Sequence, residues 1–211
     1  GMHAELTTPG PAREVIELFF ELGLTADDLA GARLTAAGID PADIGIVVLS
    51  HLHFDHVGGL AQLPNARLLV QRNEWAAGFD PDLAAANTLN PADFDLGHDV
   101  VQLDGEHDVF GDGRATCIPT PGHTPGHNSI RVESKGEHAF ILGDVAHSPI
   151  QAHYTDWNPE FDIIPEAARA TRHAVLDMLE AEGTLVSAGH FPDPGFGRFV
   201  RGEERRFWQG L

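Results

Sequence analysis

Four side chains capable of binding a metal occur within six consecutive positions of the sequence. They follow the apolar, β-branched stretch 46–49, which predicts a buried strand, and they are His51, His53, Asp55 and His56. Imidazole nitrogen and carboxylate oxygen suit borderline divalent metals such as zinc, manganese or iron. Polar groups beside a buried strand are costly unless they are paired or bind a metal. The pattern therefore predicts a metal site, in which the first two histidines face one ion and Asp55 and His56 face a second.

Three further side chains of this kind follow other predicted strands. His123 lies in a Pro-Gly-His turn, Asp144 follows a short apolar run, and His190 follows another. An isolated histidine or aspartate at a strand end is most often a turn or capping residue. Its repetition at four strand ends instead indicates ligands that gather at one edge of a layered sheet. Seven such side chains would be enough for two ions, with room left for water.

The elements that must position these residues are short strands with flanking helices. Strands are expected at residues 46–49, 67–71, 100–103, 108–110, 115–120, 129–133, 139–142 and 185–187, with a hairpin at 199–208. Helices are expected at 11–23, 60–63, 73–77 and 165–182, the last with an apolar side formed by Ala167, Ala170, Ala174, Leu176 and Leu179. This order favours layered sheets covered by helices over a regularly alternating doubly wound fold.

Two stretches without a clear period, 78–97 and 151–164, are predicted to be surface loops. Long irregular loops in compact domains are often lids or binding loops. Aromatic side chains in or near them are candidates for an apolar pocket wall, although core packing is the better interpretation of each one alone. The candidates are Phe54, Trp75, Phe79, Tyr154, Trp157, Phe191 and Phe196.

The composition is that of a globular protein. The 211 residues are 42% hydrophobic and 21% charged, which predicts one domain, with a helical segment at 1–43 and a metal-binding core at 44–198. The formal charge of −19 disfavours nucleic-acid partners, and no apolar run is long enough to predict a membrane span. The single cysteine, Cys117, indicates a reducing compartment, and no signal peptide is recognised. A cytoplasmic location is therefore expected.

The motifs resemble those of the metallo-β-lactamase-fold hydrolase superfamily. The matching elements are His51-Leu52-His53-Phe54-Asp55-His56, the turn at His123, Leu142-Gly143-Asp144 and Ala188-Gly189-His190, and the similarity covers roughly residues 44–198. The resemblance implies an α+β fold, an αββα sandwich with two metals at the open edge between the sheets. It also implies which residues bind each ion. The first ion would be held by His51, His53 and His123, and the second by Asp55, His56 and His190. Asp144 would bridge the two.

Within this superfamily the sequence is most similar to the N-acyl homoserine lactonases, at 51–59, 70–75 and 120–127. The segments 144–147 and 189–197 are closer to the related methyl-parathion-hydrolase-like enzymes. The resemblance implies a hydrolase that uses two divalent ions, most simply zinc, with iron or manganese as alternatives. A hydroxide bridging the metals would attack a lactone, ester or phosphotriester of a small molecule. A β-lactam is disfavoured, because true β-lactamases of this fold commonly carry cysteine or serine where Asp144 stands.

Two side chains are expected to assist the reaction. Asp55 has a second oxygen that can pass a proton to the leaving alkoxide. His147 occupies the position at which the lactonases carry a tyrosine that hydrogen-bonds the substrate carbonyl, and it would assist the developing oxyanion. Tyr154, the only tyrosine, is a conceivable substitute, with packing against Trp157 as the alternative.

The N-terminal region departs from the family. Only 43 residues precede Ile44, and they are predicted to be mostly helical, whereas the family normally has several strands there. The first sheet would therefore have an edge that is exposed or paired with another chain, which makes a homo-oligomer plausible.

Three alternative functions stay open. A thioester hydrolase of the glyoxalase II type needs a basic patch for glutathione, and the acidic composition speaks mildly against it. An iron-dependent oxidoreductase would bind iron with a similar ligand set, and persulfide dioxygenases of this kind typically use fewer ligands than the seven candidates in this sequence. A non-catalytic metal-binding protein is the third alternative, and the missing N-terminal strands give it some weight.

Overall fold

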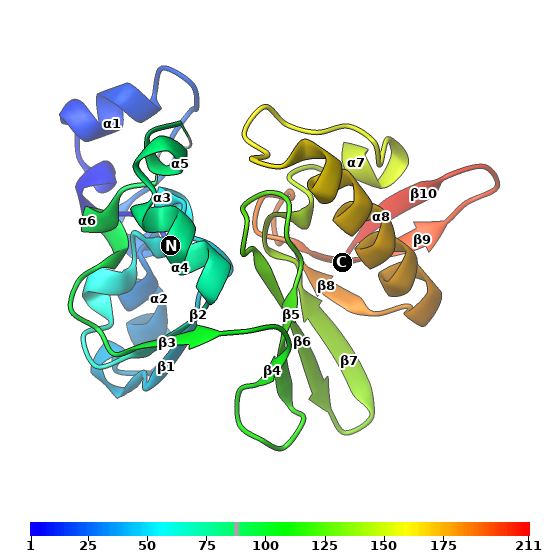
Figure 1. Ribbon diagram of the computed structural model, residues 1–211, viewed down its shortest axis with the longest axis horizontal. Helices are drawn as coiled ribbons and strands as arrows, with labels where there is room; N and C mark the ends of the chain where they lie inside the picture. Colours follow the sequence, from blue (N-terminus) through cyan, green and yellow to red (C-terminus); the bar gives the residue numbers. More distant parts are fainter. Residues whose placement is uncertain (87–88) are drawn as a thin grey trace. The chain divides into compact units, whose positions relative to one another are not determined.

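The computed structural model describes residues 1–86 and 89–211, which form two compact units (Figure 1). The first unit comprises Gly1–Leu69 and Gly78–Val101, and the second comprises Val70–Ala77 and Gln102–Leu211. The chain passes between the units within strands β2 (Arg67–Gln71) and β3 (Val100–Leu103) and within helix α4 (Arg72–Phe79). The assignment of the whole chain to one domain stays a prediction.

The N-terminal part of the first unit is helical, as predicted, but its first helix is shorter. Helix α1 spans Pro11–Ile16 and not 11–23, and α2 spans Ala30–Ala36. The chain turns after α1 because the Arg13 guanidinium donates hydrogen bonds to the carbonyls of Leu22 at 2.6 Å and Leu24 at 3.3 Å. The side chains of Leu18 and Phe19, expected on a buried helix face, are each 77% exposed. Short 3₁₀ helices span Ala4–Thr7, Ala26–Asp28 and Pro41–Asp43.

A small sheet in the order β1-β2-β3 follows, with β1 at Ile46–Val48. β1 and β2 are parallel, with Val47 opposite Leu68. Residues Leu68 to Val70 of β2 are all buried, as is typical of a strand covered on both faces. Within residues 1–86 and 89–211 no strand precedes Ile46, so the described chain lacks N-terminal strands as predicted.

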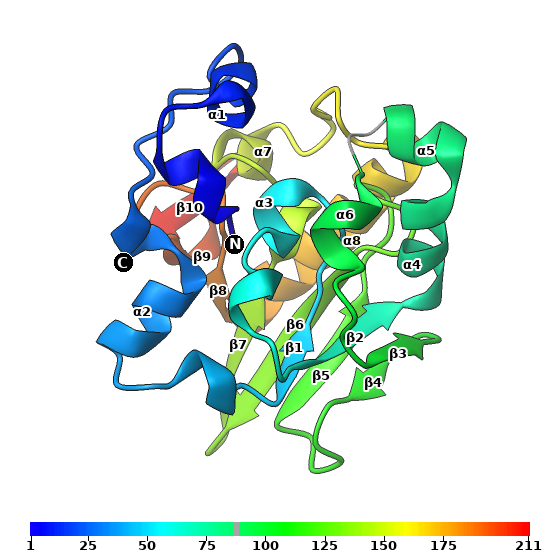
Figure 2. The same cartoon turned by 90° about the vertical axis from the view of Figure 1, so that its left-hand side faces the viewer.

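Short helices follow the first strand. Helix α3 spans Phe54–Val57 and lies beside α6 (Pro91–Phe94), and a 3₁₀ helix spans Leu60–Gln62 (Figure 2). The prediction of an irregular loop over 78–97 is wrong in part, because α5 (Pro81–Ala86) and α6 lie there. Each of these two helices begins at a proline, and the side chain of the preceding residue, Asp80 or Asn90, accepts a backbone hydrogen bond from its first turn. Residues 87–88 lie outside the described residues.

The second unit is built on a larger, mainly antiparallel sheet. Among the described residues its order is β10-β9-β8-β7-β6-β5-β4, with β7 and β8 parallel. The strands are β4 (His107–Asp108), β5 (Ala115–Pro119), β6 (Asn128–Ser134), β7 (Glu137–Ile141), β8 (Leu185–Ser187), β9 (Phe196–Arg201) and β10 (Arg206–Gly210). The predicted hairpin between β6 and β7 is confirmed by the pairing of Ser134 with Glu137.

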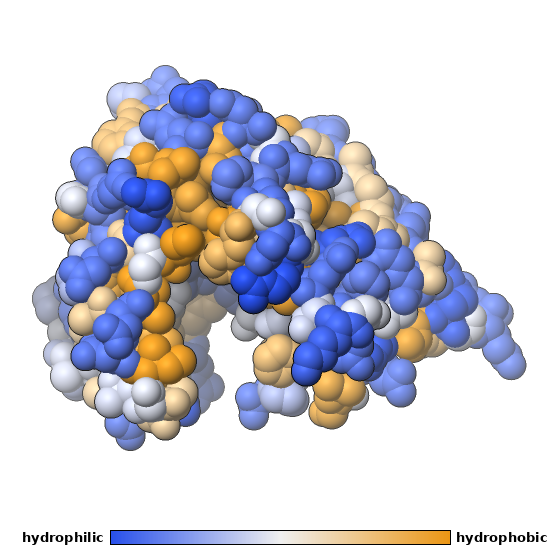
Figure 3. Space-filling view, turned by 90° about the horizontal axis from the view of Figure 1, so that it is seen from below, coloured by the Kyte–Doolittle hydropathy of each residue, from blue (hydrophilic) through white to orange (hydrophobic). Residues whose placement is uncertain are grey.

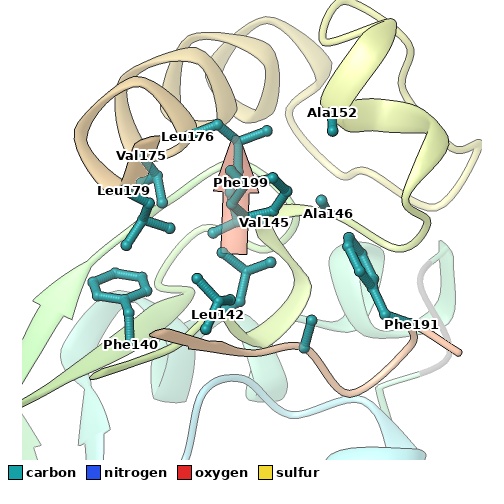
Figure 4. Close-up of a cluster of buried hydrophobic side chains, with 12 residues drawn as sticks. Phe140, Leu142, Val145, Ala146, Ala152, Val175, Leu176, Leu179, Phe191 and Phe199 are labelled. Atoms are coloured by element: carbon teal, nitrogen blue, oxygen red, sulfur yellow. The ribbon is translucent and has the colours of Figure 1, made fainter. Parts of the chain in front are cut away.

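Helix α8 (Pro165–Glu182) covers this sheet and has the predicted ends. Proline begins it, and Gly183 ends it with a positive φ of 63°, a conformation that glycine adopts without strain. Its apolar side was predicted wrongly in part, because Ala170 and Ala174 are exposed. Figure 4 shows Val175, Leu176 and Leu179 of α8 pointing toward residues that follow or lie in the strands. That core contains Phe140, Leu142, Val145, Ala146, Ala152, Val186, Ala188, Phe191 and Phe199.

The predicted irregular stretch 151–164 begins with a short helix, α7 (Ile150–His153), and continues without regular structure as far as α8. Hydrophobic side chains also reach the surface in several patches among hydrophilic ones (Figure 3). Within the described residues, no helix has both the length and the apolar character needed to cross a membrane.

Candidate metal centre

The four candidate ligands of the first unit lie on the segment that leads from β1 into α3. The Leu49 N–H donates to the Leu69 carbonyl at 2.9 Å, and the chain leaves the sheet after that bond. His53 immediately precedes α3, and its carbonyl accepts hydrogen bonds from the backbone N–H groups of His56 at 2.9 Å and Val57 at 3.1 Å. A loop followed at once by a helical turn therefore brings together side chains that an extended strand would direct to opposite faces.

The rings of the first unit gather around His51. Its ring centroid lies 4.7 Å from that of His53 and 4.0 Å from that of His56. The Ser50 hydroxyl lies 3.2 Å from His51 Nδ1 and 3.3 Å from His56 Nδ1. Asp55 Oδ2 lies 3.4 Å from His56 Nε2. The first two histidines are buried, while Asp55 and His56 are half-buried.

In the second unit, three imidazoles converge on one carboxylate oxygen. Asp144 Oδ2 lies 3.4 Å from His123 Nε2, 3.2 Å from His190 Nε2 and 3.0 Å from His147 Nε2. Asp144 sits in the 3₁₀ helix Gly143–Val145 that follows β7, and its side chain is 4% exposed. Three predicted ligands are thus brought together within this unit. His147, predicted as a catalytic donor, joins them.

The turn that carries His123 is built for close contact with its neighbours. At Gly126 a Cβ atom would lie 2.2 Å from the backbone nitrogen of Glu74, a contact that excludes any other residue. The buried Glu74 carboxylate accepts hydrogen bonds from the Thr124 hydroxyl at 2.6 Å and from the Gly126 N–H at 3.0 Å. The carbonyl of His123 accepts a bond from the Ile163 N–H at 2.9 Å. Glu74, not singled out by sequence reasoning, therefore helps to fix the turn.

His127, which sequence reasoning had left outside the ligand set, positions Asp144 through the backbone. Its Nε2 accepts a hydrogen bond from the Asp144 N–H at 2.8 Å. Its Nδ1 lies 3.1 Å from the Thr120 carbonyl, to which it donates. A neutral ring satisfies both bonds in this tautomer, and the fully buried imidazole therefore supports the carboxylate without an additional charge.

The chemistry of the donor set fits a divalent cation. His123 Nδ1 lies 3.0 Å from Asp162 Oδ1, so Nδ1 carries the proton and donates it to this carboxylate. In the neutral ring, Nε2 then presents a lone pair to the oxygen of Asp144, and two electron-rich atoms in contact repel each other. A divalent cation coordinated by both atoms removes this repulsion, and the combination of nitrogen and oxygen donors is one that zinc, iron and manganese accept.

Asp162 is itself held by a buried cation. Its Oδ2 accepts a hydrogen bond from Arg172 Nη2 at 3.0 Å, and both side chains have no exposed surface. Burial lowers the pKa of Arg172, and the charge of Asp162 opposes that shift. Sequence reasoning missed both residues. The available signal was an arginine on the buried side of α8, four residues after Ala168 and four before Leu176.

His147 is enclosed by other rings. Its ring is stacked on that of His190 with centroids 5.2 Å apart, and it meets the ring of Phe161 edge to face at 4.8 Å. Burial lowers its pKa, while the hydrogen bond and charge of Asp144 oppose the shift. The backbone N–H of His147 donates a hydrogen bond to Gln151 Oε1 at 2.7 Å. The imidazole is thus held beside Asp144.

The aromatic candidates for a pocket wall divide into two groups. Tyr154 stacks on Trp157 at 4.3 Å with an interplanar angle of 9°, which is the packing alternative foreseen for this tyrosine. The two side chains are nevertheless 40% and 56% exposed. Phe191, in contrast, is buried against Phe199 and Trp208 in the core. Phe191 therefore follows the core-packing interpretation that was preferred for each of these residues alone.

Comparisons with known proteins agree with these motifs. Residues 9–190 match the family model described as the metallo-beta-lactamase superfamily. An N-acyl homoserine lactonase, AttM of Azorhizobium caulinodans, is 36% identical over 183 residues, which are 79% of this chain. The match covers 65% of that relative, so the chain spans a little under two thirds of its length.

Two solved structures have similar folds. The hydrolase AbOPH of the beta lactamase superfamily has a TM-score of 0.75 and 28% identity, and the match covers 86% of this chain and 69% of AbOPH. AidC, a dizinc quorum-quenching lactonase, also has a TM-score of 0.75, with 25% identity over 91% of this chain and 72% of its own. Both therefore share this fold.

Proposed function

The chain belongs to the metallo-beta-lactamase superfamily, and we propose that it is a metal-dependent hydrolase of lactones. The observation that carries this proposal is the convergence of three imidazole nitrogens on the buried Asp144 Oδ2 within the second unit. The similarity to a lactonase such as AttM supports a lactone as the substrate.

We assign the ligands of two divalent ions as the family motifs imply. His51, His53 and His123 would hold the first ion, Asp55, His56 and His190 would hold the second, and Asp144 would bridge both. Support comes from each unit separately. In the first, the rings of His53 and His56 lie beside that of His51, and Asp55 lies beside His56. In the second, His123 and His190 meet at one oxygen of Asp144. Zinc is the proposed metal, since AidC is a dizinc lactonase.

When bound, such a pair of ions polarises the substrate carbonyl and lowers the pKa of water. Side chains of this protein would orient the reacting groups around these ions. Asp55 would take up the proton of the attacking water on a carboxylate oxygen that is free of metal, and would deliver it to the alkoxide released when the ring C–O bond breaks. His147, whose Nε2 lies 3.0 Å from Asp144 Oδ2, would redirect this N–H from the carboxylate to the developing oxyanion, a contribution of roughly 2–4 kcal/mol when the donor is well aimed.

The proposal is tested with the zinc-loaded protein and three substrate classes: N-acyl homoserine lactones, aryl esters and phosphotriesters. The lactone is expected to have the highest kcat/KM, and treatment with a chelator is expected to abolish the reaction. Readdition of zinc restores it. A higher kcat/KM for a phosphotriester or an ester than for the lactone would change the assigned substrate class. Lactones that remain intact after prolonged incubation would contradict the proposal.

The remaining alternatives are separated by two measurements. Metal analysis of purified protein distinguishes iron, which an oxidoreductase would require, from zinc. A thioester of glutathione tests the glyoxalase II-type activity, and hydrolysis of this thioester in preference to lactones would favour that alternative. A protein that holds metal and hydrolyses none of these compounds would match the non-catalytic alternative.

A further inference from the structure

A buried chain of polar contacts leads away from His123 on the side opposite to Asp144. The ring nitrogen Nδ1 lies 3.0 Å from Asp162 Oδ1, and the other oxygen of this carboxylate accepts a hydrogen bond from Arg172 at 3.0 Å. The side chains of all three residues are at most 2% exposed. Each oxygen of Asp162 thus serves one partner, and the carboxylate links an imidazole to a guanidinium.

Arg172 extends the same network to the loop that follows α7. Its Nε donates to the Val145 carbonyl at 2.8 Å, directly after Asp144 in sequence. Its Nη1 lies 3.1 Å from the Thr155 carbonyl and 2.9 Å from the Trp157 carbonyl. One side chain therefore holds Asp162, the turn that carries Asp144, and the backbone next to the exposed Tyr154–Trp157 pair.

A buried ion pair alone does not account for this arrangement. Such a pair is often no more stabilising than apolar residues of similar volume, because desolvation offsets the attraction. A carboxylate that accepts the Nδ1 proton of a histidine, however, fixes the tautomer and orientation of the ring and makes Nε2 a stronger metal ligand. Here the ring so held is a predicted ligand, and its Nε2 points at Asp144.

We propose that Asp162 and Arg172 are positioning residues of the metal centre: Asp162 holds His123 with Nε2 directed at the metal, and Arg172 holds Asp162. The inference rests on the proposed function only in requiring that His123 bind a metal, and it names two residues outside the assigned ligand set.

The test is the zinc affinity of four full-length proteins, measured by competition with a chromogenic chelator. They are the wild type, Asp162→Asn, the double variant Asp162→Asn with Arg172→Met, and Asp156→Asn as a control. Asp156 lies in the same loop, pairs with His173 at 2.9 Å and has a side chain 75% exposed. The double variant removes the buried guanidinium together with the carboxylate charge, so it carries no unpaired buried ion.

Both variants at Asp162 are expected to bind zinc about 10–100-fold more weakly than the wild type, the usual loss when such a partner is removed. The control should bind as the wild type does. If Asp162 only balances the charge of Arg172, the double variant will recover wild-type zinc affinity, and this result would overturn the inference. The single variant Asp162→Asn leaves Arg172 without its carboxylate partner and can fail to fold. In that case the zinc affinity of the double variant alone decides the test.

A second measurement needs no variant. The ¹⁵N chemical shifts of His123 in the wild type report which ring nitrogen carries the proton. We expect a proton on Nδ1 in the zinc-loaded protein, and an unprotonated Nδ1 would contradict the role of Asp162. Neither measurement involves a substrate, so a protein that binds zinc but leaves lactones intact overturns the proposed function and leaves this inference standing.

Discussion

The two units of the molecule supply their candidate ligands in different ways. In the first unit, all four come from one segment of six residues, and the hydroxyl of Ser50 lies near two of the rings at 3.2 and 3.3 Å. In the second unit, His123, Asp144 and His190 come from three separate strand ends. There the supporting groups are buried and in part charged, and they are Glu74, His127, Asp162 and Arg172.

This difference shows where pre-organisation has to be provided by tertiary structure. Side chains on one short segment are positioned largely by the local backbone, so they need less support from distant parts of the chain. Side chains from distant segments have no such local constraint, and each needs its own hydrogen-bonded support. Substitutions at supporting residues should therefore be more damaging in the second unit than in the first, and four predictions test this.

The largest effect is expected from Asp144→Ala. The substitution removes the oxygen on which three imidazoles converge. It also removes the ligand that is proposed to bridge the two metal ions. Zinc content should fall below two ions per chain, and kcat/KM for a lactone should fall by at least about 10³-fold, beyond the loss of a single oxyanion donor. Metal analysis after dialysis measures the zinc content, with Asp156→Ala as the control. Retention of two tightly bound ions would contradict the ligand assignment.

The next effect concerns His147. Replacement with phenylalanine keeps the ring contacts with His190 and Phe161 but removes both ring nitrogens. We expect a loss of about 10²–10³-fold in kcat for the lactone, as for other oxyanion donors, with little change in zinc content. Tyr154→Phe is the matched control and should retain the activity, because Tyr154 packs against Trp157. If Tyr154→Phe loses activity and the His147 variant retains it, the oxyanion donor is Tyr154 and not His147.

A smaller effect is expected from Glu74→Gln in the second unit. Thr124 and Gly126 both donate to Oε2 of Glu74, and a glutamine oxygen at that place can still accept both bonds but without the negative charge that strengthens them. The free energy of unfolding should decrease by roughly 1.5–3 kcal/mol, the range for a hydrogen bond to a charged group. Urea denaturation of the metal-free protein measures this, with the exposed Glu137→Gln as the control. Equal stability of the two variants would argue against a supporting role for Glu74.

The smallest effect is expected from Ser50→Ala in the first unit. Its hydroxyl contacts to His51 and His56 are long and uncharged, so the substitution should weaken zinc binding by roughly 0.5–1.5 kcal/mol at most. The same chelator competition used for Asp162→Asn measures it. If Ser50→Ala proves more damaging than Asp162→Asn, the contrast between the two units is wrong.

Local signals made much of the fold predictable from the sequence. Helix α8 has its predicted ends because proline and glycine act on the backbone where they stand. Strand β2 was predicted at its observed bounds because its apolar run is short and β-branched or aliphatic. The predicted superfamily and its fold are confirmed by the family match and by the similarity to AbOPH.

The parts that were missed depend on contacts between distant segments. Helix α1 ends early because Arg13 binds carbonyls that follow it, and no periodicity encodes that turn. The partners of His123 lie 39 residues away at Asp162 and, through it, at Arg172. The seven candidate ligands could be named from motifs. Their binding of metal and their division between two ions stay predictions, as do the homo-oligomer and the cellular location.

The central claim is that the ligands of the two units bind the same pair of ions. Anomalous scattering from crystals of the zinc-loaded protein, recorded on both sides of the zinc absorption edge, tests it most directly. We predict two peaks, one bound by His51, His53 and His123 and the other by Asp55, His56 and His190, with Asp144 bound to both. Peaks that are ligated by residues of only one unit would contradict the account.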